Sequence, residues 1–145
     1  MGADTREPRE KYFLKIAHMV ASRATCPRAS VGCVITHKNR IVSTGYNGSA
    51  KNAEHCIEVG CLMDHGSCRR TIHAEMNALV NMAGGPYPTD LIMYCTHKPC
   101  YQCAKAIATA NIRLVYYDQD YKDPVRDKLN LDIGLFKVDM GNQMC

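Results

Sequence analysis

The sequence predicts an α/β fold in which helices cover a partly parallel sheet. Three observations support this prediction: a helical apolar periodicity near the N-terminus, two β-branched runs that fit a hairpin, and strands that alternate with helices along the second half. The 145 residues suit a single domain over residues 1–145. Hydrophobic residues make up 46% and charged residues 22%, which is typical of a folded globular chain.

The first half of the chain is predicted to hold a helix, a hairpin and a long loop. The helix is predicted because Phe13, Ile16 and Val20 recur at the spacing of one helical face. The loop is predicted from its glycines and scattered polar residues, with one helical turn inside it. A loop this long in a small domain is usually functional or internally fixed. These elements are expected at residues 8–23 (helix), 31–36 and 41–44 (strands) and 45–71 (loop).

Helices and strands alternate along the second half. Ile72, Met76 and Leu79 share a helical face, and the Gly-Gly-Pro at 84–86 ends that helix. Pro99 and Pro124 each stand at a predicted helix start, where proline is favoured. The helices are expected at residues 71–83, 100–110 and 123–129, and the strands at 91–96, 114–117 and 135–138.

Composition excludes several classes of protein. No apolar run approaches the roughly 20 residues of a membrane span, and the first eleven residues are too charged for a secretion signal. The net charge of +4 suits an anionic small molecule but is too small for a nucleic-acid track. We therefore expect a cytoplasmic protein with no membrane or nucleic-acid partner.

Nine cysteines are an unusually high number for this length. In a reducing cytosol, clustered cysteines form metal or catalytic sites more often than disulfides, and the odd count also argues against a disulfide framework. Cys33 and Cys95 lie in predicted strands and are expected in the core. His37, His55 and His97 carry no separate signal.

Two short motifs open neighbouring predicted helices. His73 begins one helix, and Cys100 and Cys103 lie on one face at the start of the next. Free N–H groups and the helix dipole favour thiolates there. One imidazole and two thiolates would give zinc three ligands and leave the fourth position to water, which is the catalytic pattern. Zinc lowers the pKa of such a water to about 7.

Glu75 lies two residues after His73 and is predicted to be the catalytic acid and base. A carboxylate beside the bound water can accept its proton and deliver it elsewhere. Two structural alternatives are open: a closed zinc site at Cys100 and Cys103, and a solvated glutamate in a first helical turn. The spacing H-x-E followed by P-C-x-x-C is typical of zinc nucleobase deaminases, and the residues together favour catalysis.

Over roughly residues 10 to 138, the chain resembles the deoxycytidylate (dCMP) deaminases of the zinc-dependent cytidine and deoxycytidylate deaminase family. The His-Ala-Glu and Pro-Cys-x-x-Cys motifs are shared by all zinc deaminases, whereas Tyr-Asn-Gly-Ser at 46–49 and the cysteine-rich loop at 47–71 point to dCMP. The resemblance implies a three-layer α-β-α cytidine-deaminase-like fold with a central mixed five-stranded sheet. The matching segments are 26–28, 31–32, 45–49, 73–78, 99–105, 116–117 and 120–122.

The activity that this resemblance implies is hydrolysis of dCMP to dUMP and ammonia, which would supply dUMP for thymidylate synthesis. A zinc-activated water attacks C4 of cytosine, while Glu75 passes a proton to N3 and then to the departing amine. Arg28 is the candidate for the 5′-phosphate, because a guanidinium binds phosphate oxygens bidentately. Tyr121 and Lys122 could instead be a half-buried aromatic and a solvated lysine. The substrate-binding candidates are Arg28, Asn47 (sugar), Ala74 (base, through its backbone), Tyr121 and Lys122.

Regulation and assembly are also implied by the resemblance alone. Family members are commonly homo-hexamers that dCTP activates and dTTP inhibits, with Mg²⁺, at a site near subunit contacts. Their usual setting is bacterial or virus-infected host cytosol. The matching effector-binding candidates are Gly45, Tyr46, Asn47, Gly48 and Asn77.

Four further cysteines could form a second, structural zinc site that fixes the long loop to the start of the sheet. They are Cys26, Cys56, Cys61 and Cys68. Some relatives carry a second zinc here with mixed ligands, so His65 is a possible substitute for one cysteine. The alternative is that some of these thiols are simply free.

Two other functions are open. One is deamination of another cytosine or adenine substrate, such as free cytidine, tRNA or single-stranded DNA, and a phosphate contact at Arg28 would argue against free cytidine. The other is a zinc-organised binding module without catalysis, in which Glu75 would have no role.

Overall fold

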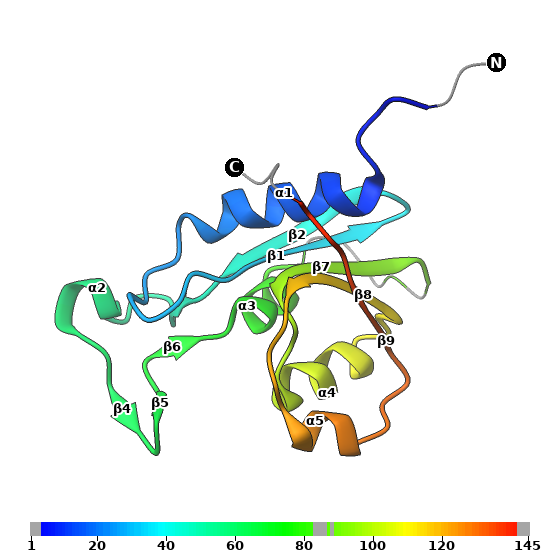
Figure 1. The fold of residues 1–145 in the computed structure, drawn as a ribbon. Coiled ribbons are helices and arrows are strands. Elements are labelled where there is room, and N and C mark those ends of the chain that lie inside the picture. Colours follow the sequence, from blue (N-terminus) through cyan, green and yellow to red (C-terminus); the bar gives the residue numbers. More distant parts are fainter. Residues whose placement is uncertain (1–3, 83–86, 88, 142–145) are drawn as a thin grey trace.

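In the computed structural model, which describes residues 4–82, 87 and 89–141, the chain folds around one mixed sheet. Figure 1 shows α1 (Arg9–Ala21) on one face of this sheet and α3 (Ala74–Val80) and α4 (Tyr101–Thr109) on the other. The predicted three-layer fold with five central strands is therefore confirmed. In spatial order the strands are β2 (Arg40–Tyr46), β1 (Gly32–His37), β7 (Leu91–His97), β8 (Leu114–Gln119) and β9 (Gly134–Lys137).

The pairing directions divide the sheet into two halves. β1 pairs antiparallel with both β2 and β7, so the hairpin forms one edge. β8 pairs parallel with β7 and with β9. The parallel half needs crossovers, which are α4 and α5 (Pro124–Lys128). Because α3 and α4 begin beside the carboxyl end of β7, that end collects the motif residues.

Helix α1 covers one face of the sheet through its apolar stripe. Phe13, Leu14 and Ala17 are buried against a group that includes Tyr94 of β7. The helix lies so close to β1 that a Cβ on Gly32 would stand 2.0 Å from the carbonyl oxygen of Ala17. No described helix is long and apolar enough to cross a membrane.

The opposite face of the sheet carries the larger core. Ile35 and Met93 of the central strands and Ile107 of α4 are fully buried in it. Cys33 and Cys95 lie in the same cluster, directly opposite each other on β1 and β7, as the sequence predicts for core residues. This core fixes α3 and α4 on the sheet.

Helix α3 is shorter than the predicted helix over residues 71–83. Residues Thr71–Ile72 instead form strand β6, which pairs with β3 (Gly48–Ser49). The pairing requires extended backbone, so the helix begins only after His73. The predicted stop at residues 84–86 lies outside the described residues.

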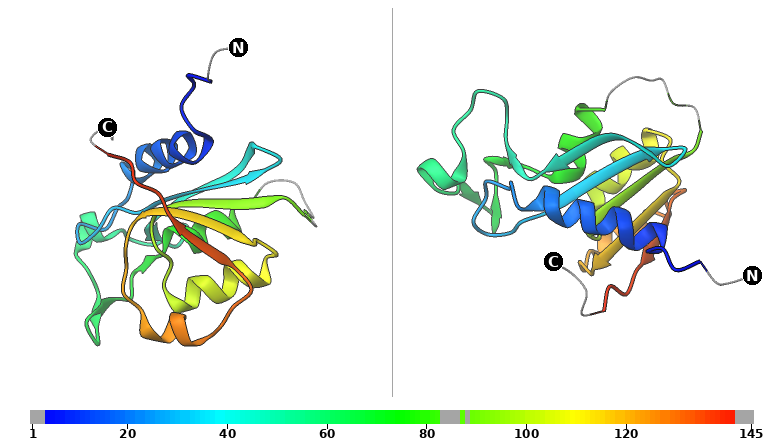
Figure 2. Two further views of the ribbon diagram at one scale, coloured as in Figure 1. Left: turned by 45° about the vertical axis from the view of Figure 1, so that its right-hand side comes forward. Right: turned by 90° about the horizontal axis from the view of Figure 1, so that it is seen from above.

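The prediction of one loop over residues 45–71 is wrong in detail. Strand β2 extends to Tyr46, and the loop holds short strands as well as the expected helical turn, α2 (Cys56–Val59). A two-residue strand is too short to show a periodicity of two, so the sequence pattern did not signal it. Figures 1 and 2 show this part of the chain projecting from one end of the sheet. Its additional strands are β3, β4 (Met63–Asp64), β5 (Ser67–Cys68) and β6.

Candidate active site

Three candidate metal ligands converge from the starts of two helices. His73 is the N-cap of α3 and Cys100 the N-cap of α4, each with extended backbone, and Cys103 follows in the first turn of α4. The Nδ1 atom of His73 lies 3.5 Å from Sγ of Cys100 and 3.4 Å from Sγ of Cys103. All three ligand atoms lie within 4.8 Å of one another.

These distances fit zinc. With Zn–S bonds of about 2.3 Å and Zn–N bonds of about 2.0–2.1 Å, tetrahedral geometry puts nitrogen and sulfur ligands about 3.6 Å apart. Two sulfurs and one nitrogen are also ligands that zinc prefers. Because the described residues of this cluster supply three ligand atoms, a fourth position would be available to water or substrate.

The surroundings of the two thiols shift their pKa values. The hydrogen bond between the two cysteines lowers the pKa of Cys100 to about 4, and the contact with His73 acts in the same direction. The same thiol–thiol bond and burial raise the pKa of Cys103. The contact with Cys100 raises the pKa of His73. The low pKa of Cys100 favours its thiolate form, which is the form that binds zinc.

Glu75 lies in the first turn of α3 and is 5% exposed. Burial raises the pKa of this carboxyl above its ordinary value, a direction that would suit a group exchanging protons near neutral pH. Burial also disfavours the alternative of a solvated first-turn glutamate.

A cavity of about 310 Å³ opens in front of this cluster. Its lining includes His73, Ala74, Glu75 and Cys100. Of the other substrate candidates, Arg28, Asn47 and Tyr121 line the same cavity, whereas Lys122 is exposed and is not among the lining residues. The sequence-based reasoning missed His97 and Lys98, which also line it. The one available signal was their position directly before the Pro-Cys motif.

The side chain of Asn47 is hydrogen-bonded to the backbone of the cavity wall. Its side-chain oxygen accepts a hydrogen bond from the N–H of Val31 at 2.8 Å, and its Nδ2 donates to the carbonyl oxygen of Ala29 at 2.8 Å. The residue is 5% exposed. Asn47 thus fixes the segment next to Arg28 and borders the cavity at the same time.

The effector candidates lie at the junction of β2 and α3. Gly45 is buried, and a Cβ there would stand 2.4 Å from both the carbonyl oxygen of Ala74 and the nitrogen of Ala78. Nδ2 of Asn77 donates to the carbonyl oxygen of Tyr46 at 2.9 Å. Gly48 is buried in β3, and Asn47 fills the role described above.

A second cluster brings four cysteines together at the projecting loop. The Sγ atoms of Cys26 and Cys61 lie 3.8 Å apart, and those of Cys56 and Cys68 lie 3.6 Å apart. All four lie within 4.8 Å of one another, and four Zn–S bonds of about 2.3 Å would place the sulfurs about 3.8 Å apart. His65 lies outside the cluster: its Nδ1 contacts Asp64 at 2.7 Å and its side chain is 85% exposed.

Backbone N–H groups lower the pKa of one of these thiols. Burial alone would raise the pKa of Cys68, but hydrogen bonds from the backbone N–H groups of Thr71, Arg70 and Leu62 outweigh it and lower the pKa to about 6. Burial raises the pKa of Cys56 to about 12. A cation among the four sulfurs would favour their thiolate forms.

A His-x-Glu helix start that faces a Pro-Cys-x-x-Cys helix start is the arrangement typical of zinc nucleobase deaminases. Residues 7–119 match the family model of the cytidine and deoxycytidylate deaminase zinc-binding region. The chain belongs to this family.

Individual relatives agree with this assignment. The chain is 49% identical over 113 residues to ComE operon protein 2 of Bacillus subtilis, an alignment that covers 77% of this chain and 60% of the relative. It is 34% identical over 119 residues to the deoxycytidylate deaminase of Saccharomyces cerevisiae, covering 78% of this chain and 38% of that protein. The chain thus spans less than two thirds of either relative.

A solved structure is similar over nearly its whole length. The dCMP deaminase of cyanophage S-TIM5, in complex with dCMP and dUMP, matches with a TM-score of 0.75 and 28% identity. The match covers 92% of this chain and 99% of the phage chain.

Proposed function

We propose that this protein, as a single deaminase domain over residues 1–145, hydrolyses dCMP to dUMP and ammonia. The observation that carries the proposal is one cavity whose lining includes His73, Glu75 and Cys100 together with Arg28. A base at the metal ligands and a phosphate at the guanidinium would both be accommodated. The relatives named deoxycytidylate deaminase, and the phage enzyme with dCMP and dUMP, support this choice of substrate.

His73, Cys100 and Cys103 would hold the zinc ion. When bound, zinc supplies activation of a water molecule near neutral pH. Glu75 accepts a proton from that water, delivers it to N3 of cytosine, and then carries a proton to the amino group on C4. The C4–N bond breaks and a C4=O bond remains, so dCMP and water give dUMP and ammonia. The burial of Glu75 keeps this proton exchange away from bulk solvent.

The other candidate residues would each contact a different part of the nucleotide. The Ala74 backbone, at the N-terminus of α3, would hold the base, and Asn47 would border the sugar. The Arg28 guanidinium would bind the 5′-phosphate, with the Tyr121 hydroxyl as a further donor. Lys122 is also proposed for the phosphate by resemblance, although it stands outside the cavity lining.

The direct test is the loss of cytosine absorbance with purified protein and equal concentrations of dCMP, deoxycytidine and dCTP. We expect fast conversion of dCMP and much slower conversion of the other two. Failure to convert any of the three, with zinc content confirmed, would overturn the proposal and favour a nucleic-acid substrate or a binding module.

We propose a structural zinc ion for Cys26, Cys56, Cys61 and Cys68. The sulfur separations and the N–H groups around Cys68 support it. Such an ion would cross-link the projecting loop to the segment before β1, as a closed four-sulfur site does in other small domains.

We also propose the regulation and assembly that the resemblance implies: activation by dCTP, inhibition by dTTP with Mg²⁺, a homo-hexamer, a cytoplasmic location and a supply of dUMP for thymidylate synthesis. The effector candidates Tyr46 and Asn77 are joined by a hydrogen bond beside the start of α3, which supports a link between this junction and Glu75. The proposed activation is tested by the dependence of the rate on dCMP concentration, which should be sigmoidal without dCTP and hyperbolic with it.

A further inference from the structure

Two cationic side chains from different parts of the fold line the cavity without a carboxylate partner. Arg28 lies between α1 and β1, and Lys98 directly follows β7. The ion pairs among the described residues include neither of them. Glu75, two residues after the proposed zinc ligand His73, is the only carboxylic acid among the described residues that line the cavity. Arg28 and Lys98 thus supply positive charge to the lining, which also includes Cys26 and Cys68 of the four-cysteine cluster.

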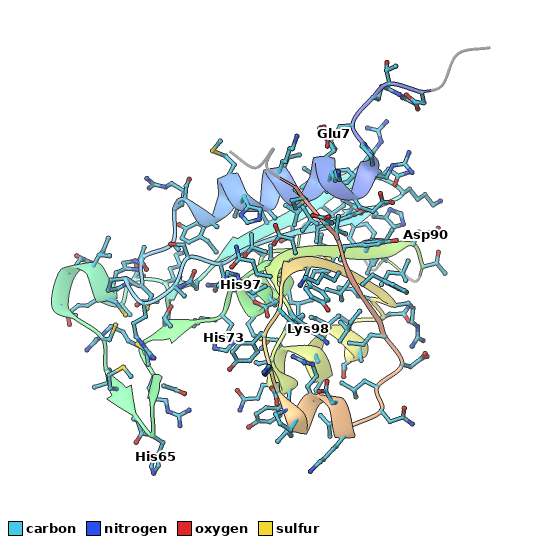
Figure 3. The ribbon with its side chains drawn as sticks, viewed as in Figure 1. Glu7, His65, His73, Asp90, His97 and Lys98 are labelled. Atoms are coloured by element: carbon cyan, nitrogen blue, oxygen red, sulfur yellow. The ribbon has the colours of Figure 1, made fainter. Side chains whose placement is uncertain are left out.

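The backbone at Lys98 is fixed on both sides. Its N–H donates to the carbonyl oxygen of Gln119 at 2.9 Å. The following residue, Pro99, is buried, and its carbonyl oxygen accepts a hydrogen bond from Nη1 of Arg126 at 2.9 Å. Nζ of Lys98 lies 5.5 Å from the centre of the Tyr117 ring. Figure 3 shows Lys98, His97 and His73 at the same end of the sheet.

The charge of this region matches a phosphomonoester. A phosphate monoester carries about −1.5 to −2 charge at pH 7, which one guanidinium and one ammonium would neutralise. A substrate without the phosphate would leave both cations without a partner inside the cavity, which lowers its affinity. Two cations thus favour a nucleoside monophosphate over the free nucleoside.

Building on the proposed function, we propose that Lys98 is a second phosphate-binding residue and, with Arg28, sets the preference for a nucleotide over a nucleoside. Lys98 is an alternative to Lys122, the lysine to which the resemblance gives the phosphate contact. Lys122 is exposed and stands outside the cavity lining, whereas Lys98 is half-buried within it.

The test compares Lys98→Met with two matched variants. We expect Lys98→Met to raise KM for dCMP about tenfold or more, with kcat and the kcat/KM for deoxycytidine nearly unchanged. Lys98→Arg should recover most of the loss because it restores the charge. Lys105→Met is the control: Nζ of Lys105 lies 5.4 Å from the Tyr101 ring, a contact of the same kind outside the cavity, and its KM should not change.

Lys122→Met separates the two candidates. A rise in KM for Lys122→Met together with an unchanged KM for Lys98→Met would overturn the proposal.

Titration calorimetry with dUMP and deoxyuridine measures binding to each variant without turnover. If the wild-type protein converts no substrate, the proposed function fails. The Lys98 proposal then depends on whether Lys98→Met weakens dUMP binding, and unchanged binding would overturn it too. Equal zinc content and thermal midpoints would verify that each variant is folded.

Discussion

Asp123 accepts a hydrogen bond from the backbone N–H of Tyr101 at 2.7 Å, so the residue that caps α5 also holds the first turn of α4. Its other carboxylate oxygen accepts from the backbone N–H groups of Val125 and Arg126, both at 3.1 Å. Since Cys100 is the N-cap of α4, the half-buried carboxylate of Asp123 connects helix α5 to a proposed zinc ligand.

Replacing Asp123 by alanine should lower the free energy of unfolding by about 1–2 kcal/mol, because a helix cap is lost and the Tyr101 N–H loses its partner. Urea unfolding at pH 7 measures this loss. Asp120→Ala is the control, since within the described part of the chain Asp120 accepts only from the N–H of the next residue. Equal stability of Asp123→Ala and the wild type would contradict the double role.

The Asp123 contribution should depend on pH. Burial alone would raise the pKa of Asp123, but the backbone hydrogen bonds from Arg126, Tyr101 and Val125 outweigh it and lower the pKa below the ordinary 3.8. Because the folded-state pKa is the lower one, the stabilisation is present above pH 3.8 and is lost as the pH falls through the folded value. The stability difference between wild type and Asp123→Ala should therefore shrink below about pH 4.

Glu75→Gln should reduce kcat for dCMP about 10²–10⁴-fold while the protein keeps its zinc, because glutamine has similar shape but cannot carry a proton. Absorbance kinetics and metal analysis by atomic emission measure the two properties on the same sample. Unchanged turnover would remove Glu75 from the mechanism. Loss of zinc together with activity would show instead that Glu75 supports the metal site.

The two clusters should account for two zinc ions per chain. Cys100→Ser should leave one ion and remove turnover, whereas Cys61→Ser should leave one ion, keep part of the turnover and lower the thermal midpoint. The buried Cys33 belongs to neither cluster, so Cys33→Ala should keep both ions. A single zinc in the wild type that survives Cys61→Ser would contradict the structural site.

Gly45→Ala should displace α3, because the new Cβ would lie 2.4 Å from the backbone of Ala74 and Ala78. We expect a loss of about 1–3 kcal/mol in unfolding free energy, typical of overpacking. Since α3 carries Glu75, kcat should fall as well. At Gly48 the nearest atom to a new Cβ is the Thr25 hydroxyl at 3.2 Å, so Gly48→Ala should cost less. Thermal unfolding of both variants compares them directly.

The sequence alone determined the main elements and the residues proposed as zinc ligands. The five strands of the sheet and helices α1, α3 and α4 follow from apolar spacing over six or more residues or from short runs of branched residues. His73, Glu75, Cys100 and Cys103 could be found because each pair is close in sequence and stands at a helix start. Local spacing is what places such residues on one face.

Only the tertiary structure decided which distant residues share the cavity. Lys98 lines it and Lys122 does not, although both are polar residues in loops after a strand. Gly45 looks like any turn glycine in the sequence, yet it is buried because α3 packs directly onto β2. The four-cysteine cluster likewise joins Cys26 to residues 30 or more positions away. These relationships depend on how helices cross the sheet, and a one-dimensional pattern carries no information about that packing.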